Sequence, residues 1–174
     1  MLSRHYKNWI SIEDERRCKG CKENHGIIYD MDEIPIPEPP LHEHCRCFIE
    51  AMKAIFAGNA TDKGKNGADC WLMKYGTLPP YYIKDDEAKI LGWKPKQGNL
   101  HVVAPRKMVT MGDYDNDDGH LPMIPGRKWY EADINYESGF RNRQRIVYSN
   151  DGLIFATYDH YRTFAEIIPG EGVK

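Results

Sequence analysis

The stretch Trp129-Tyr-Glu-Ala-Asp-Ile-Asn-Tyr136 decides the fold of this chain, because its hydrophobic residues recur with a period of two. Its apolar positions are Tyr130, Ala132, Ile134 and Tyr136, and polar residues stand between them. Such alternation predicts a half-buried β-strand with one apolar and one polar face. Further strands are predicted at residues 145–148, 153–158 and 162–168, with short turns between them. Short connections between consecutive strands predict an antiparallel meander.

Two helices are predicted before these strands. Residues Ala68–Tyr75 have a helical pattern that stops at Gly76, and residues 84–91 form a second pattern with three acidic residues near its positively polarised N-terminus. Helices first and strands afterwards indicate an α+β domain. We expect its N-terminal helices to pack on a twisted antiparallel sheet.

Length and composition exclude several classes of protein. The chain has 174 residues, 41% of them hydrophobic, which is enough for one domain and a small module. Its net charge is −2, so any nucleic acid must be bound by a local cluster of cations. The apolar runs are too short to span a bilayer, and residues 1–17 contain no apolar signal-peptide core.

The N-terminal segment carries a cluster of metal-ligand residues. Four of the five cysteines fall within thirty residues. The total number of cysteines is odd and the chain shows no secretory signal, so this pattern favours a bound metal over a disulfide framework. We expect structural zinc bound by Cys18, Cys21, Cys45 and Cys47, with His42 as an alternative ligand. Two disulfides or free thiols are the competing interpretation.

The chain divides into three parts by composition. We expect a zinc-binding module at residues 1–58, including a proline-rich loop and a short helix at 48–57. A polar, glycine-rich linker follows at 59–66, and the α+β domain occupies 67–174.

Four residues of the second part supply the groups needed to cleave a phosphodiester without a metal. Glu131 can accept a proton, His160 can donate one, and Arg141 and Arg145 can hold a charged phosphorus centre. Strand alternation places Glu131 and Arg145 where carboxylate and guanidinium can meet on the open face of the sheet. The alternative is a structural ion network with His160 as a turn residue.

Residues 67–168 resemble the barnase-like family of bacterial ribonucleases. The matching motifs, in order, include Leu91-Gly-Trp93, Gly98-Asn-Leu100, Glu131 to Tyr136, Ser138 to Asn142, Arg145-Ile146 and Asp159-His-Tyr161. The resemblance implies an endoribonuclease that needs no catalytic cofactor and forms a 2′,3′-cyclic phosphate on single-stranded RNA. It implies that Glu131 is the general base and His160 the general acid, and that Arg141 and Arg145 bind the phosphate. The residues implied to bind the rest of the substrate are Tyr114, Asn116, Asp118, Arg127 and Tyr161.

Two departures from that family concern the substrate. Its phosphate-side lysine stands one position after Lys84, where this chain has Asp85, so Lys84 enters the catalytic set as a shifted substitute. The resemblance also implies a preference for guanine, for which the family uses the loop that corresponds to residues 114–119. This loop keeps Asn116 and Asp118 but departs from the family at Asp117, which replaces an arginine.

Residues 9–49 resemble the C-terminal end of phage minor head (Mu F-like) proteins, through Cys18-x-x-Cys21 and His42-x-x-Cys45-Arg-Cys47. Such segments are often fused to toxin domains, so the resemblance implies the C-terminal region of a bacterial polymorphic toxin. We expect it to be delivered or secreted without a signal peptide of its own, and to be bound by a barstar-like immunity protein. The alternative function is an inactive ribonuclease fold that serves as a structural or RNA-binding part of a phage-head or secretion-associated protein.

Overall fold

The computed structural model describes residues 1–170, so the last four residues of the predicted 67–174 domain lie outside the described residues. It divides into two compact units. Unit 1 comprises residues 1–54 and 116–125, and unit 2 comprises 55–115 and the chain from 126 onward.

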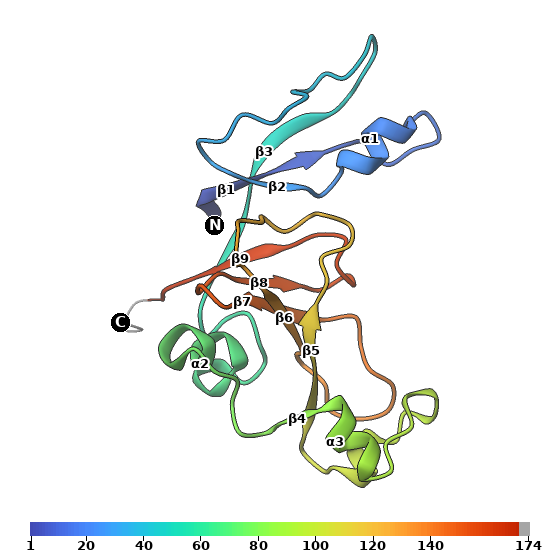
Figure 1. The fold of residues 1–174 in the computed structure, drawn as a ribbon, viewed down its shortest axis with the longest axis vertical. Coiled ribbons are helices and arrows are strands. Elements are labelled where there is room, and N and C mark those ends of the chain that lie inside the picture. The colour runs from blue at the N-terminus through green and yellow to red at the C-terminus, as the bar shows by residue number, and fades with distance from the viewer. Residues whose placement is uncertain (171–174) are drawn as a thin grey trace. The chain divides into compact units, whose positions relative to one another are not determined.

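Unit 1 is a small antiparallel sheet with one short helix (Figure 1). Its elements are β1 (Leu2–Ile10), α1 (Lys19–Asn24), β2 (Ile28–Asp30) and β3 (Phe48–Phe56), whose last two residues belong to unit 2. β1 pairs with both β2 and β3. The proline-rich segment between β2 and β3 is a loop, as predicted, because proline removes backbone donors and fixes φ.

The helix predicted at 48–57 is wrong, because this segment forms β3. Its apolar residues do fit a helical spacing. In the structure, however, Phe48 pairs with Ile10, and Met52 and Ala54 are buried on either side of the exposed Lys53. The backbone partners that favour a strand lie in β1, far away in the sequence, so local periodicity could not reveal them.

Unit 1 also holds residues 116–125, which sequence analysis assigned to the second domain. The Ile28 N–H donates to the His120 carbonyl at 2.8 Å. The Asn116 side chain bonds both backbone groups of Leu121, at 3.0 Å each, and Leu121 is only 2% exposed. This part of the predicted substrate loop is therefore folded into the N-terminal unit.

Unit 2 is a twisted sheet with few helices (Figure 1). Its strands lie in the order β9-β8-β7-β6-β5-β4, all antiparallel except the parallel β4–β5 pair. The strands are β4 (Tyr82–Lys84), β5 (Met108–Tyr114), β6 (Trp129–Asp133), β7 (Arg145–Ser149), β8 (Ile154–Thr157) and β9 (Ala165–Ile168). The helices are α2 (Ala68–Tyr75), α3 (Asp85–Ile90) and α4 (Leu100–Val103), with short 3-10 turns at Gly64–Asn66 and Pro95–Gln97.

The helices predicted at 68–75 and 84–91 and the strands of the meander are confirmed, and the fold is mixed α and β with a large sheet. Helix α2 ends at Gly76, whose φ of 68° suits a residue without a Cβ. Apolar residues of α2 pack against Ala132, Ile146 and Ala156 on one face of the sheet. That packing leaves the other face of β6 and β7 for polar side chains.

The segment predicted as a linker at 59–66 is structured in unit 2. Ala60 is 2% exposed and belongs to the core beneath α2. The buried carboxylate of Asp69 accepts hydrogen bonds from the backbone of Gly58 and Ala60 and from the Thr61 hydroxyl. A polar sequence therefore acts here as an ordered connection and not as a flexible one.

None of the helices described is long and apolar enough to cross a membrane.

Candidate active site

The polar face of β6 carries two carboxylates, and each has a different partner on β7. Glu131 lies opposite Val147, and Asp133 lies opposite Arg145. Because strand side chains alternate, Glu131 and Asp133 share the face opposite to Ala132. The guanidinium of Arg145 therefore meets Asp133, two residues away from the carboxylate that sequence analysis expected it to meet.

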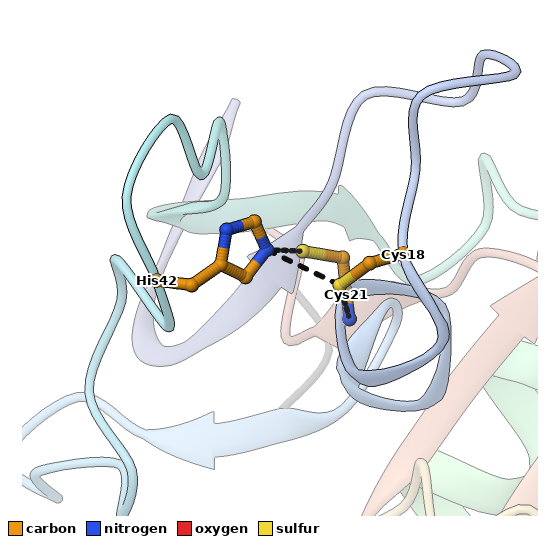
Figure 2. A group of neighbouring side chains, drawn as sticks. All are labelled: Cys18, Cys21 and His42. Carbon is orange, nitrogen blue, oxygen red and sulfur yellow. Dashed lines mark hydrogen bonds between the residues drawn. The ribbon is translucent and has the colours of Figure 1, made fainter.

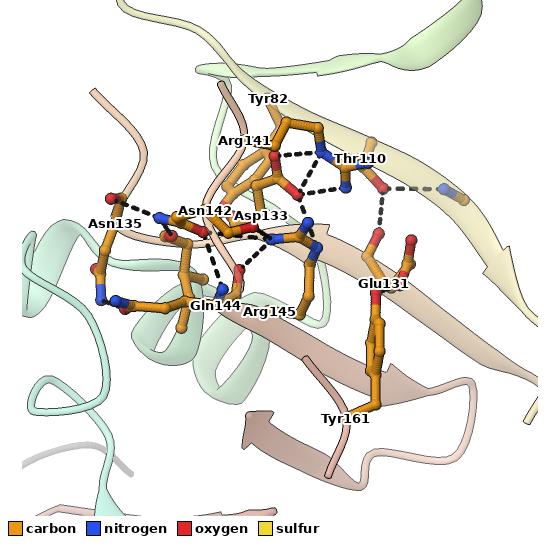
Figure 3. A network of polar contacts seen from close by, with 12 residues as sticks. Tyr82, Thr110, Glu131, Asp133, Asn135, Arg141, Asn142, Gln144, Arg145 and Tyr161 are labelled. Carbon is orange, nitrogen blue, oxygen red and sulfur yellow. Dashed lines mark hydrogen bonds and ion pairs between the residues drawn. The ribbon is translucent and has the colours of Figure 1, made fainter. Parts of the chain in front are cut away.

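Asp133 is the centre of a buried ion cluster (Figure 3). It is 0% exposed, and its carboxylate accepts from Arg141 Nε at 2.8 Å and Arg141 Nη2 at 2.5 Å. Arg145 Nε lies 3.1 Å from the same carboxylate, and its Nη1 donates to the carbonyls of Asn142 and Gln144. Although burial opposes the charged form, the bonds to Asp133 raise the pKa of Arg141. Two arginines thus lie side by side around one carboxylate, with one net positive charge.

Tyr161 connects the predicted base to the predicted acid. Its hydroxyl donates to the carboxylate of Glu131, a residue that is only 9% exposed (Figure 3). Its ring lies 4.9 Å from the His160 ring and stacks on Tyr114 at 5.1 Å, measured between centroids. Burial, and then the Glu131 carboxylate, raise the pKa of Tyr161, so the phenol remains a donor. Tyr161 was predicted to bind substrate, and its bond to Glu131 was not predicted.

The turn that carries His160 has an unusual backbone conformation. His160 and Tyr161 have φ values of 62° and 67°, a region that residues with a Cβ seldom adopt. The Thr157 hydroxyl donates to Asp159 and accepts from the Tyr161 N–H, and Asp159 also accepts two bonds from Thr163. Although burial opposes it, these bonds lower the pKa of Asp159. The buried Thr157 thus fixes the turn and leaves the His160 side chain exposed.

A glycine and a histidine position the loop that contains Arg141. A Cβ at Gly98, whose φ is 60°, would lie 2.9 Å from the backbone of both Gly139 and Phe140. The Gly139 N–H donates to His101 Nδ1 at 3.2 Å. Close approach at Gly98 therefore brings the Arg141 loop against the segment that precedes α4.

Lys84 is not brought together with the four other predicted catalytic residues. It pairs with Thr110, which pairs with Ala132, so it belongs to the face opposite Glu131. There it lines a hollow with Tyr130 and Tyr148. Asp85, at the position where the family has its lysine, begins α3 and lines the same hollow. The Lys89 hydrogen bond lowers the pKa of Asp85, and Arg141 contributes to the same shift.

The remaining predicted substrate residues have partners of their own. Arg127 forms a bidentate pair with Asp151, at 2.8 Å for Nη2, and lies over the Trp129 ring at 5.9 Å. In unit 1, the Asp118 carboxylate lies 3.2 Å from His120 Nδ1 and accepts a hydrogen bond from the His120 N–H, also at 3.2 Å. The Asn116 side chain is already bound to Leu121, so its amide serves the loop's own fold.

Unit 1 contains a cluster of sulfur and nitrogen ligands (Figure 2). Cys18 caps α1, and Cys21 follows inside the helix. His42 Nε2 lies 3.2 Å from Cys18 Sγ and 3.5 Å from Cys21 Sγ. Cys21 Sγ lies 3.7 Å from Cys45 Sγ, and Cys47 joins the group formed by Cys21 and Cys45. No disulfide links the cysteines of the described residues.

These separations suit tetrahedral zinc. Zinc bonds of about 2.3 Å to sulfur and about 2.0 Å to nitrogen give tetrahedron edges of about 3.8 Å between sulfurs and about 3.5 Å from sulfur to nitrogen. The separations of 3.7 Å between Cys21 and Cys45 and 3.5 Å between Cys21 and His42 match these edges, and the Cys18–His42 separation is shorter, at 3.2 Å. His42 Nδ1 lies 2.8 Å from the Glu43 carbonyl, which orients Nε2 towards the sulfurs, as metal-binding histidines require. His42, predicted as the alternative ligand, lies inside the cluster.

Comparisons with known proteins concern mainly unit 2. A family model described as ribonuclease matches residues 65–168. A ribonuclease of Heyndrickxia coagulans is 50% identical over 102 residues, which are 59% of this chain and 94% of that protein. Ribonucleases of Bacillus intermedius and Bacillus pumilus are each 49% identical over 102 residues, and the matched part spans 63% of their length.

Proposed function

This chain belongs to the ribonuclease family and is an endoribonuclease, and from that premise we propose that it cuts single-stranded RNA by transesterification without a catalytic metal. Tyr161 carries the proposal, because it bonds Glu131 and packs against His160. Glu131 and His160 are thereby held at one place, next to the cluster of Arg141 and Arg145 on the same face.

In the proposed reaction each of these residues has one role. Glu131 removes the proton of the 2′-hydroxyl, whose oxygen attacks the adjacent phosphorus. His160 protonates the leaving 5′-oxygen, and the product is a 2′,3′-cyclic phosphate. Arg141 and Arg145 stabilise the extra negative charge on the phosphorus oxygens, since Asp133 keeps both guanidiniums oriented before substrate arrives. The need for a 2′-hydroxyl restricts the substrate to RNA.

The test uses the whole chain, an RNA dinucleotide and its deoxy counterpart, with chelator present. We expect cleavage of RNA alone, with the cyclic phosphate identified by ³¹P NMR. Absence of cleavage would support the alternative of an inactive fold. Mapping the cut sites on a mixed RNA tests a guanine preference, which the family resemblance implies although loop 114–119 departs from the family at Asp117.

We further propose that the chain is part of a bacterial toxin, delivered or secreted and neutralised by a barstar-like immunity protein. The support is the combination of a ribonuclease with an N-terminal segment that resembles phage minor head proteins. A host cell that makes an active ribonuclease needs an inhibitor for it. Loss of viability on expression, reversed by the neighbouring gene product, tests this role.

Structural zinc in unit 1 is the remaining proposal. It is supported by the tetrahedral separations around Cys21, Cys18, His42 and Cys45, with Cys47 as the competing fourth ligand. Bound there, zinc would hold α1 to the loop that precedes β3. The catalytic residues belong to unit 2, so no step of the proposed reaction uses the metal.

A further inference from the structure

A groove in unit 2 lies on the side of the sheet covered by α2. Its volume is about 450 Å³, and it is lined by Lys63, Asn66, Trp71, Pro79, Pro80 and Tyr81. That volume is within the range of small-molecule sites and is large enough for a nucleotide. Since α2 packs on the face of Ala132, and Glu131 faces the other way, the groove is separate from the cleavage site.

Aromatic rings and ammonium groups lie in the groove and beside it, where Tyr75 contacts the lining residue Trp71 and Lys74 contacts Tyr75. The Trp71 and Tyr75 rings lie 5.0 Å apart at 58°, and Tyr75 is 55% exposed. Lys74 Nζ lies 5.1 Å from the Tyr75 centroid, and Lys63 Nζ lies 5.0 Å from that of Tyr81. Exposed rings beside cations are the arrangement with which proteins bind single strands, because rings stack on bases and cations attract phosphates.

The charge around the groove also suits a polyanion. Lys107 Nζ donates to the Pro80 carbonyl at 2.9 Å, which places a third ammonium group at the rim. The carboxylate of Asp69 acts on Tyr81 electrostatically, but it is 0% exposed and its oxygens are bonded to Gly58, Ala60 and Thr61. The surface therefore presents lysines, although the whole chain is slightly acidic.

We propose that this groove, here called the α2 groove, is a second binding site for single-stranded RNA. It holds one part of a strand while another part lies at Glu131 and His160. Linking two contacts on one strand raises the effective concentration of substrate at the cleavage site. That the bound strand is also the substrate rests on the proposed function. That the groove binds a single strand does not.

Kinetics on two substrates provides the first test. We expect KM for a long polynucleotide to rise about tenfold in Lys63→Gln/Lys74→Gln, which loses phosphate contacts, and in Tyr75→Ala, which loses stacking. The kcat, and both constants for a dinucleotide, should stay unchanged. Tyr75 is exposed, so its replacement spares the core. The control Arg4→Gln/Lys53→Gln makes the same charge change on exposed residues of unit 1. An unchanged KM for the long substrate overturns the proposal.

Binding of single-stranded DNA provides a second test that does not depend on cleavage, because this polymer lacks the 2′-hydroxyl. We expect weaker binding by Lys63→Gln/Lys74→Gln, and a slope of log K against log salt that is smaller by about 0.7 for each lost phosphate contact. If the double variant keeps the wild-type affinity for DNA and the wild-type salt slope, the proposal is overturned. The same result is expected if the groove binds an acidic protein and not a nucleic acid. If wild-type protein binds DNA through the groove but cuts no RNA, only the proposed function fails.

Discussion

The buried carboxylate of Asp133 receives the guanidinium of Arg141 along one edge, through Nε at 2.8 Å and Nη2 at 2.5 Å. The same carboxylate lies 3.1 Å from Arg145, so one acid orients two cations. A phosphate that approaches this cluster meets arginines already fixed in place, which spares the cost of ordering them during the reaction.

Replacing Asp133 by asparagine should destabilise the protein and weaken cleavage together. The change leaves two buried or half-buried guanidiniums without their counter-ion, which typically costs about 3–5 kcal/mol. Urea denaturation measures the loss in the free energy of unfolding. The matched control is Asp151→Asn, which removes the partner of Arg127 at a more exposed pair and should cost at most about 1 kcal/mol. Equal losses in both variants would contradict a special role for Asp133.

Removing either proton-transfer group should abolish most of the activity and leave the fold intact. Glu131→Ala and His160→Ala should each lower kcat about 10²-fold or more, which is typical for a positioned acid or base. The controls are Glu137→Ala and His44→Ala, because both residues are exposed and play no part in the mechanism. Turnover at the wild-type rate in either test variant, measured on an RNA dinucleotide, would remove the mechanism.

Purified protein should contain close to one zinc per chain by elemental analysis. Cys18→Ser or Cys21→Ser should lower this content, whereas Cys70→Ser, at a buried cysteine of unit 2, should not. Chelation should loosen unit 1 but preserve dinucleotide cleavage, because the catalytic residues belong to unit 2. Loss of all cleavage on chelation would show that the two units are not independent.

An acidic inhibitor should compete with RNA for the arginine cluster. Its Kd should rise with salt, because charge steers and strengthens the encounter. Titration of the immunity protein encoded beside this chain measures both effects. Equally tight binding to Arg141→Ala/Arg145→Ala would show that the inhibitor covers another surface.

Stability should fall in alkali. Burial raises the pKa of Tyr81 and Tyr148 to about 12, and burial with Glu131 raises that of Tyr161. Unfolded tyrosines ionise near about pH 10. Their stabilising contribution is complete below about pH 10 and is lost as pH rises towards the folded pKa values, because the unfolded chain then loses protons that the folded chain keeps. Urea midpoints across this range measure the decline, and Tyr161→Phe should reduce it. Midpoints that stay constant would contradict this account.

Local pattern was sufficient for much of unit 2. The alternation around Glu131 predicted β6 and the shared face of Glu131 and Asp133, and Gly76 marked the end of α2. These features depend on neighbours in the sequence. Strand β3 and the ordered segment at 59–66 were missed, because their stability comes from β1 and from Asp69.

The sequence by itself determined which reactive side chains the chain contains, and where apolar residues follow the helical or the strand period. Residue type and spacing are local properties. Only the tertiary structure decided which groups meet. Strand register paired Arg145 with Asp133 and turned Lys84 away from Glu131. A left-handed turn brought Tyr161 to Glu131, and contacts with β2 placed His120 in unit 1. Register, turns and long-range pairing are set by the balance of packing over the whole chain, which no short stretch of residues contains.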